Sequence, residues 1–120
     1  MENSRLLGTK IEEEAISYLN LQGINIICHS FSYRQGEIDL IGIENKNTLV
    51  FFEVKYRKNA NQGLAIEAVD LRKQKQISKT ALFFLAKNPK YEDYFIRFDV
   101  IGFDGDKKIT WIKNAFDYVR

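Results

Sequence analysis

Hydrophobic positions along this chain recur with two different periods, and each period predicts one kind of element. Over residues 5–22 the apolar positions recur every three or four residues until Gly23, which predicts a helix that stops at this glycine. Short apolar and β-branched runs follow at 24–28, extending toward residue 31, at 37–43 and at 48–56. Turn residues separate these runs, so they predict three consecutive strands.

The second half of the chain has a longer helical pattern followed by two more strands. Apolar residues from Ile66 to Leu85 keep the period of an amphipathic helix, which we predict to end before Asn88 and Pro89. Strands are predicted over 95–103 and 108–113, around a turn at 104–106, with a short terminal piece at 115–119. The order αβββαββ joins a hairpin meander to a crossover helix. It predicts an α/β fold with a central mixed five-stranded sheet flanked by helices.

Length and composition limit the class of protein. A chain of 120 residues that is 45% hydrophobic suits one domain, predicted to span 1–120. Its start lacks a secretory pattern and it has no long apolar span, so we expect a cytoplasmic protein without membrane contact. Cys28 and His29 are the single cysteine and histidine, which excludes an internal disulfide and a structural zinc site. Any metal would be held mainly by carboxylates, which favours Mg²⁺ or Mn²⁺.

Other chemistries find little support in the sequence. No glycine-rich phosphate-binding motif occurs, so we expect no small-molecule cofactor. The chain also lacks the motif of a serine hydrolase. Cys28 stands in an apolar run and is interpreted as a core residue.

Positive charge is concentrated in one part of the chain. Residues 55–90 carry nine Lys or Arg against two acids, although the whole chain has a net charge of only +2. Such a segment is typical of a surface that binds phosphates, but a solvated lysine-rich helix would have the same composition. Our candidate nucleic-acid contacts are Arg34, Arg57, Arg72, Lys73, Lys75 and Lys79.

Charged residues occur inside the strongest strand pattern. The run 48–56 is apolar on both faces, which predicts a central strand, yet it contains Glu53 and Lys55 on one face. A buried acid is unfavourable unless it is paired or bound to a metal. A structural ion pair, or a strand end that has reached solvent, would also explain these two residues.

A second acid, Asp39, lies within the preceding strand pattern. If the turn centres on Lys46, residues whose numbers sum to 92 face each other, and Asp39 lies opposite Glu53. Cβ atoms of cross-strand partners are about 4.5–5.5 Å apart, close enough for both carboxylates to bind one cation. The first helix offers a third acid, Glu12, at the edge of its apolar stripe. Three consecutive glutamates there are equally typical of a solvated face.

This arrangement of an acid, then Glu-x-Lys on the next strand, after a helix with a glutamate, resembles the PD-(D/E)XK nuclease superfamily. Over residues 8–103 the pattern resembles the YraN family more closely. The matching stretches are Gly8 with Glu12 and Ala15, Gly36-Glu37-Ile38-Asp39-Leu40-Ile41, Leu49-Val50-Phe51-Phe52-Glu53-Val54-Lys55 with Arg57, Ala68-Val69 with Lys73, and Arg97-Phe98-Asp99-Val100.

The resemblance implies a restriction-endonuclease-like core similar to that of Holliday-junction resolvases. It implies Asp39 and Glu53 as metal ligands and Lys55 as the catalytic lysine. The resulting hypothesis is an Mg²⁺- or Mn²⁺-dependent nuclease in which the Val54 carbonyl completes the metal site and Glu12 assists catalysis. We expect DNA rather than RNA as the substrate, with branched DNA among the forms cleaved. A homodimer is expected only by analogy to the resolvases.

Two other functions are compatible with the same sequence features. One is a non-catalytic nucleic-acid-binding module, accessory to DNA repair or recombination, that keeps the fold and the basic face. The other is an interaction domain with a relic site.

Overall fold

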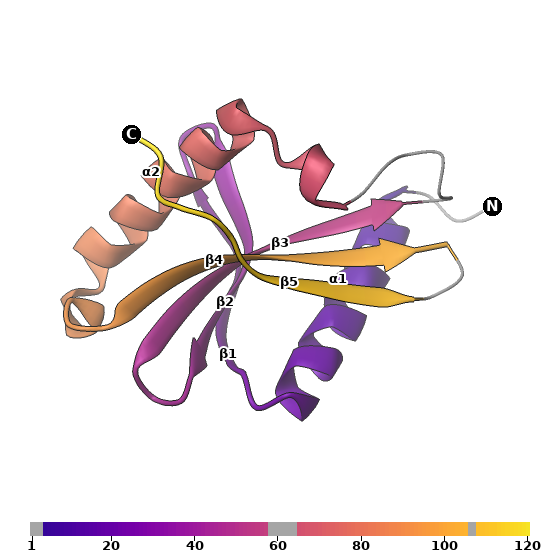
Figure 1. Cartoon of the computed structure of the whole chain (residues 1–120), viewed down its shortest axis with the longest axis horizontal. Coiled ribbons are helices and arrows are strands. Elements are labelled where there is room, and N and C mark those ends of the chain that lie inside the picture. Colours follow the sequence, from indigo (N-terminus) through magenta and orange to yellow (C-terminus); the bar gives the residue numbers. More distant parts are fainter. Residues whose placement is uncertain (1–3, 58–64, 106–107) are drawn as a thin grey trace.

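The computed structural model describes residues 4–57, 65–105 and 108–120 (Figure 1). One five-stranded sheet with the order β1-β2-β3-β4-β5 lies between two helices. The elements are α1 (Ser4–Leu21), β1 (Asn25–Tyr33), β2 (Gly36–Glu44), β3 (Thr48–Arg57), the short 3-10 helix η2 (Ala65–Ala68), α2 (Leu71–Lys87), η3 (Pro89–Tyr91), β4 (Phe95–Asp104) and β5 (Ile109–Phe116). Within these ranges, no helix combines the length and apolar character needed to cross a membrane.

The sheet is mixed, as the alternating patterns predict. Strands β1 and β2, β2 and β3, and β4 and β5 pair antiparallel, whereas β3 and β4 pair in parallel through the α2 crossover. Strand β3 is central, which explains why both of its faces are apolar. The predicted register between β2 and β3 is confirmed, because Leu40 pairs with Phe52 and Ile43 with Leu49.

Each face of the sheet has its own hydrophobic core. The side covered by α2 buries Leu49 and Phe51 of β3, together with Ile77, Ala81 and Phe84 of the helix. On the α1 side the buried residues are Ile11, Ala15, Leu19, Ile24, Leu40, Val50, Phe52, Ile101 and Phe103. The C-terminal residues also lie against α2, since the Val119 amide donates a hydrogen bond of 2.9 Å to Ser78 Oγ.

Three element boundaries differ by more than one residue from those predicted. The long second helix begins at Leu71 rather than near Ile66, because the Asp70 side chain caps it by accepting a 2.9 Å bond from the Lys73 amide. Strand β1 continues to Tyr33, and β5 continues to Phe116 and so includes part of the predicted terminal piece. Pairing with β2 and β4 extends these edge strands beyond their apolar runs.

Strands β2 and β3 separate beyond the Leu40–Phe52 pair. From there β2 continues alongside β1 as far as Gly36, whereas β3 continues alongside β4 as far as Arg57. We call this point the β2–β3 fork. The two acids predicted to face each other, Asp39 and Glu53, are the residues that come directly after the last pair on each strand.

Candidate active site

The Asp39 side chain replaces backbone pairing at the β2–β3 fork. Its Oδ2 atom accepts a hydrogen bond of 2.7 Å from the Val54 amide, across the point where the strands stop pairing. Ile38 joins the core on the α2 side whereas Leu40 joins the core on the α1 side, although regular alternation would place them on one face. Opposite Asp39 on β1, Ser30 has a left-handed φ of 56°. The irregular backbone therefore directs the Asp39 carboxylate toward β3 rather than onto a face.

The Val54 carbonyl points into the same fork. In a strand, the amide and carbonyl groups of one residue are directed to the same side, as in a hydrogen-bonded antiparallel pair. Because the Val54 amide is directed at Asp39, its carbonyl is also directed toward β2, where no ladder partner follows Leu40. This places a backbone oxygen beside the Asp39 carboxylate.

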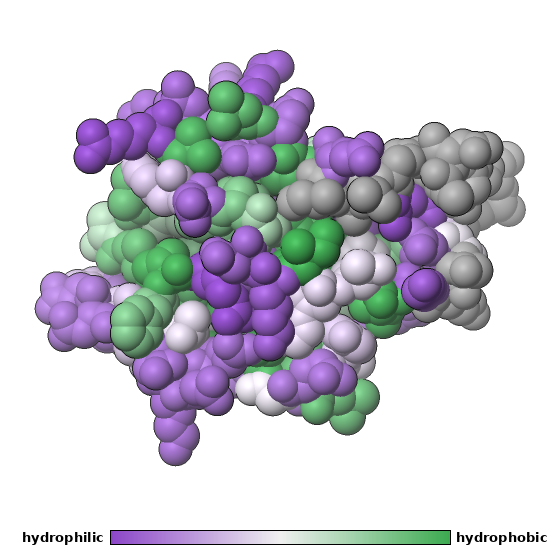
Figure 2. All heavy atoms as spheres, viewed as in Figure 1, coloured by the Kyte–Doolittle hydropathy of each residue, from purple (hydrophilic) through white to green (hydrophobic). Residues whose placement is uncertain are grey.

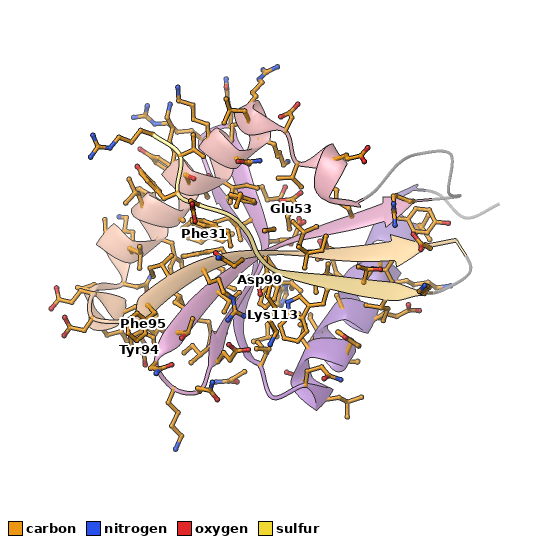
Figure 3. All side chains as sticks on the ribbon, in the orientation of Figure 1. Phe31, Glu53, Tyr94, Phe95, Asp99 and Lys113 are labelled. Carbon is orange, nitrogen blue, oxygen red and sulfur yellow. The ribbon has the colours of Figure 1, made fainter. Side chains whose placement is uncertain are left out.

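Glu53 lies on the face of the sheet covered by α2, next to two lysines. Its side chain is 5% exposed, and its Oε1 atom lies 3.2 Å from Lys55 Nζ and 3.7 Å from Lys73 Nζ. Lys55 follows on the same face of β3, and Lys73 comes from the first turn of α2. Figure 3 shows Glu53 on the α2 side of the sheet. The carboxylate is thus enclosed by the sheet and the helix, with two flexible ammonium groups as partners.

Burial makes both acids difficult to ionise, and at Glu53 the charge of Asp39 adds to this effect. Burial first, and then the charge of Asp39, raise the pKa of Glu53 to about 7, although Lys55 and Lys73 oppose the rise. Burial also raises the pKa of Asp39, and the hydrogen bond from the Val54 amide opposes this. Two acids with raised pKa values in one cluster are typical of a functional site, although structural ion pairs can have the same effect.

Glu12 of α1 approaches Asp39 from the other side of the sheet. It is half-buried, and its pKa is raised by burial and by the charges of Asp39 and Glu37, whereas His29 lowers it. Its neighbours Glu13 and Glu14 are exposed. Within the described ranges, no three His, Cys, Asp or Glu side chains come together as a metal-binding group. Glu12 therefore lies near the site without completing its ligand set.

The fork fits a divalent cation held by two carboxylates and one carbonyl. Asp39 has a single side-chain hydrogen bond among the described residues, and the ion-pair partners of Glu53 there are Lys55 and Lys73. Hard cations such as Mg²⁺ prefer oxygen ligands and usually keep several waters, so a site with few protein ligands suits them. A cation at the fork would also offset the charge of Asp39, which contributes to the raised pKa of Glu53.

The predicted phosphate contacts fall into three groups. Arg72, Lys75 and Lys79 are exposed along α2, and Arg34 is exposed at the turn between β1 and β2. Figure 2 shows mostly hydrophilic side chains over α2, with hydrophobic ones among them. Arg57 instead forms a 2.6 Å ion pair with Asp104, between the ends of β3 and β4. Lys73, predicted as a phosphate contact, lies beside Glu53.

Sequence reasoning missed the position of Lys73 and the role of a second buried acid. Asp70 as a helix cap would have placed Lys73 in the first turn of α2, close to the end of β3. The second acid, Asp99, is completely buried on β4 and was noticed only as part of a family motif. Its two oxygens accept bonds of 2.9 Å from Arg97 Nε and Nη2, Trp111 Nε1 and the Asn114 amide.

The fold and the cluster at the fork together define an α/β protein with a charged site at the edge of a central strand pair. Residues 11–103 match the uncharacterised protein family UPF0102, so this chain belongs to that family. This membership confirms the resemblance to the YraN family.

Three relatives match over nearly their whole length. A UPF0102 protein of Coxiella burnetii is 40% identical over 111 residues, or 92% of each chain. A UPF0102 protein of Francisella tularensis is 40% identical over 114 residues, covering 94% of this chain and 96% of the relative. A UPF0102 protein of Acinetobacter baumannii is 41% identical over 125 aligned positions, covering 92% of this chain and 93% of the relative.

Proposed function

We propose that this protein is a metal-dependent nuclease that hydrolyses phosphodiester bonds in DNA, including branched DNA. The observation that carries the proposal is the pair of acids at the fork: Glu53 lies beside Lys55 and Lys73, and the charge of Asp39 helps burial to raise the pKa of Glu53 to about 7. A purely structural role would be served better by fixed hydrogen-bond donors than by two mobile lysines.

Each residue of the cluster has a defined role in the proposed reaction. Asp39, Glu53 and the Val54 carbonyl would hold Mg²⁺ or Mn²⁺. When bound, the ion supplies a Lewis acid for the phosphate and lowers the pKa of a water molecule. Lys55 stabilises the negative charge that develops on the phosphate as the bond to the leaving oxygen breaks. The exposed cations of α2 bind flanking phosphates.

Charge balance explains why the site would need its cation before it binds substrate. The two ionised acids and the two lysines nearly neutralise each other, and both ammonium groups are within 3.7 Å of Glu53. With a divalent cation on the carboxylates, the lysines are released from their pairing. The cluster as a whole then becomes positive and attracts a phosphodiester.

A cleavage screen combined with one variant tests the proposal. Labelled duplex, flap, junction and single-stranded DNA would be incubated with Mg²⁺ and with Mn²⁺, and we expect wild-type cleavage that EDTA abolishes. Asp39→Asn keeps the size of the side chain and removes its charge, so it should abolish cleavage and weaken Mn²⁺ binding measured by calorimetry. Unchanged Mn²⁺ affinity in this variant would exclude Asp39 as a ligand.

The rival function is a nucleic-acid-binding module without catalysis. It is favoured by the finding that only two acidic side chains of the described residues meet at the fork. Salt-dependent DNA binding with no cleavage of any substrate in either metal would establish the module and reject the nuclease.

A further inference from the structure

A groove lies between the turn that joins β1 to β2 and one side of α2, away from the carboxylates. It encloses about 810 Å³, and its lining includes Tyr33, Arg34 and Gly36 of the turn region and Gln76, Lys79 and Phe83 of α2. We call it the hairpin–α2 groove. Resting on the proposed function, we propose that this groove binds an unpaired DNA strand that leads away from the cleavage site.

Aromatic rings inside the groove provide a surface for a nucleobase. The rings of Tyr33 and Phe83 are stacked, with centroids 3.7 Å apart and planes 5° from parallel. This stack uses one face of each ring, and the flexible Arg34 and Lys87 side chains, which lie over the Tyr33 and Phe83 rings, would move aside for a base to stack there. Both side chains are only half-buried. Stacking on such rings is how proteins hold unpaired bases with little regard to sequence.

The charges around the groove suit a phosphate backbone. The Arg34 guanidinium carbon lies 5.3 Å from the centre of the Tyr33 ring, and Lys87 Nζ lies 5.4 Å from the centre of the Phe83 ring. Lys79 also lines the groove, and no acid does so in the described part of the chain. The groove therefore complements a polyanion and would repel an acidic peptide.

Arg34 is the first central residue of the two-residue turn between Tyr33 and Gly36, a position at which the favoured hairpin turns have a positive φ. Arg34 has a left-handed φ of 54°, a conformation that residues other than glycine, asparagine and aspartate adopt with strain. The turn is already held to α2 by other contacts. The Phe31 ring packs edge-on against Phe84 at 5.1 Å, and Gly36 lies so close to Thr80 that a Cβ there would collide with its hydroxyl. The Tyr33–Phe83 stack is thus one of several contacts between the turn and α2.

Helix α2 connects the groove to the carboxylate cluster. Lys73, Gln76, Thr80, Phe83 and Lys87 follow one another at intervals of three or four residues, so they form one stripe along the helix. From Lys73 to Phe83 the helix rises about 15 Å, which corresponds to roughly four nucleotides at the spacing of B-DNA. A strand whose scissile phosphate lies beside Lys55 and Lys73 would reach Tyr33 and Phe83 a few nucleotides away.

Fluorescence anisotropy in EDTA measures this binding without any cleavage. The probes are a labelled single-stranded oligothymidylate and a blunt DNA duplex of the same length. Tyr33→Leu keeps an apolar side chain but removes the ring, and we expect it to weaken single-strand binding roughly tenfold. Tyr33→Phe keeps the ring and should bind like wild type. Both variants should bind the duplex as wild type does.

Two further variants test the charges and control for general electrostatics. Arg34→Gln should weaken single-strand binding and lower the slope of log affinity against log salt by about 0.7, as expected for one lost contact to a single strand. Lys90→Gln removes an exposed lysine that lies over the Tyr91 ring, outside the groove, and should change neither quantity. A 2-aminopurine base in the strand should be quenched by wild type and by Tyr33→Phe, but not by Tyr33→Leu.

Each outcome decides the proposal. Absence of single-strand binding, an equal loss for duplex and single strand in Tyr33→Leu, or no loss at all would overturn it. Tighter, Tyr33-dependent binding of an RNA strand would overturn the assignment to DNA. Tyr33-dependent binding without metal-dependent cleavage would reject the nuclease function and support strand binding in the hairpin–α2 groove. Metal-dependent cleavage with unaltered binding in Tyr33→Leu would support the nuclease function and reject strand binding in the groove.

Discussion

Two buried acids on neighbouring strands, Asp99 of β4 and Glu53 of β3, have very different hydrogen-bond and ion-pair partners. Asp99 is completely buried, and its oxygens accept four hydrogen bonds of 2.9 Å from the guanidinium of Arg97, the Trp111 ring and a backbone amide. Glu53 is nearly as buried, but its partners are ammonium groups at 3.2 and 3.7 Å, and its pKa is raised to about 7. Figure 3 shows them on opposite sides of the sheet.

The difference teaches how to tell a structural charge from a functional one. Arginine offers a rigid, planar set of donors that matches a carboxylate, whereas lysine offers a mobile point charge. Hydrogen bonds to Asp99 raise the pKa of Arg97, and Arg97 also bonds Glu44 Oε1 at 2.6 Å, so this network is complete without any further ligand. The cluster at the fork retains unrelieved repulsion between Asp39 and Glu53. We infer that the first network stabilises the fold and that the second is kept for binding.

Removing the structural acid should have the largest effect on stability. Asp99→Ala would leave Arg97 largely buried without its main partner, and breaking such a pair costs about 3–5 kcal/mol. Urea unfolding measures the loss. Mn²⁺ affinity of the folded fraction should stay at the wild-type level. A loss below about 1 kcal/mol would show that Asp99 is not a structural charge.

Lys55→Ala should affect catalysis rather than binding. Its ammonium lies beside a predicted metal ligand and would act mainly on the transition state, so the single-turnover cleavage rate should fall by about 10² while DNA affinity stays within a few-fold. The matched control is Lys90→Ala, which removes an exposed lysine outside the proposed DNA contacts. If the Lys55 variant cleaves at the wild-type rate but binds weakly, Lys55 is only a phosphate contact.

The pH dependence of stability should reveal the raised pKa of Glu53 without any metal. Because the pKa of Glu53 in the folded protein, about 7, lies above its ordinary value of 4.5, the folded state binds this proton more tightly than the unfolded chain. Its contribution to stability is therefore full below pH 4.5 and is lost as the pH rises toward 7, with a slope of up to about 1.4 kcal/mol per pH unit.

Glu53→Gln should flatten this part of the stability profile. Urea unfolding in EDTA at several pH values between 4.5 and 7 measures both proteins. Asp39, whose pKa is also raised, contributes in the same direction and remains in the variant, so some slope should persist. Identical slopes for the two proteins would mean that folding does not raise the pKa of Glu53.

The smallest expected effect concerns the exposed cations of α2. Replacing Arg72 and Lys75 by Ala should lower the slope of log affinity against log salt by about 0.9 for each lost duplex contact, and by similar amounts for all sequences. Lys73 is left out because it lies 3.7 Å from Glu53 and would disturb the acids. An unaltered slope would identify this face of α2 as merely solvated.

The sheet could be predicted almost completely from the sequence. The doubly apolar run of β3 identified the central strand, and the turn around Lys46 fixed the register with β2. The start of α2 could not be placed, because apolar spacing continues through η2 and only the side chain of Asp70 marks the break. The apolar spacing in the sequence does not distinguish a short 3-10 segment from the first turn of the helix that follows it.

The candidate site was predictable in its strand residues and not in its helix residue. The strand residues Asp39, Glu53 and Lys55 lie on adjacent strands, and the register of the two strands determines which side chains face each other. Lys73 reaches Glu53 through the packing of α2 on the sheet, which no local pattern encodes. The Asp99 network was similarly invisible, since Arg97, Trp111 and Glu44 come from three different strands.

The parallel pairing of β3 with β4 also bears on the order in which the chain folds. The β2–β3 hairpin closes through a turn of a few residues, whereas Thr48 meets Phe95 only after the whole crossover has been ordered. Short loops close first, because loop-closure entropy grows with the length of chain enclosed. We therefore expect Asp39 and Glu53 to meet early, while Lys73 arrives with the late docking of α2. During synthesis the two acids would repel each other in the newly formed hairpin. This repulsion would persist until Lys73 arrives with α2, or until a cation binds from solution.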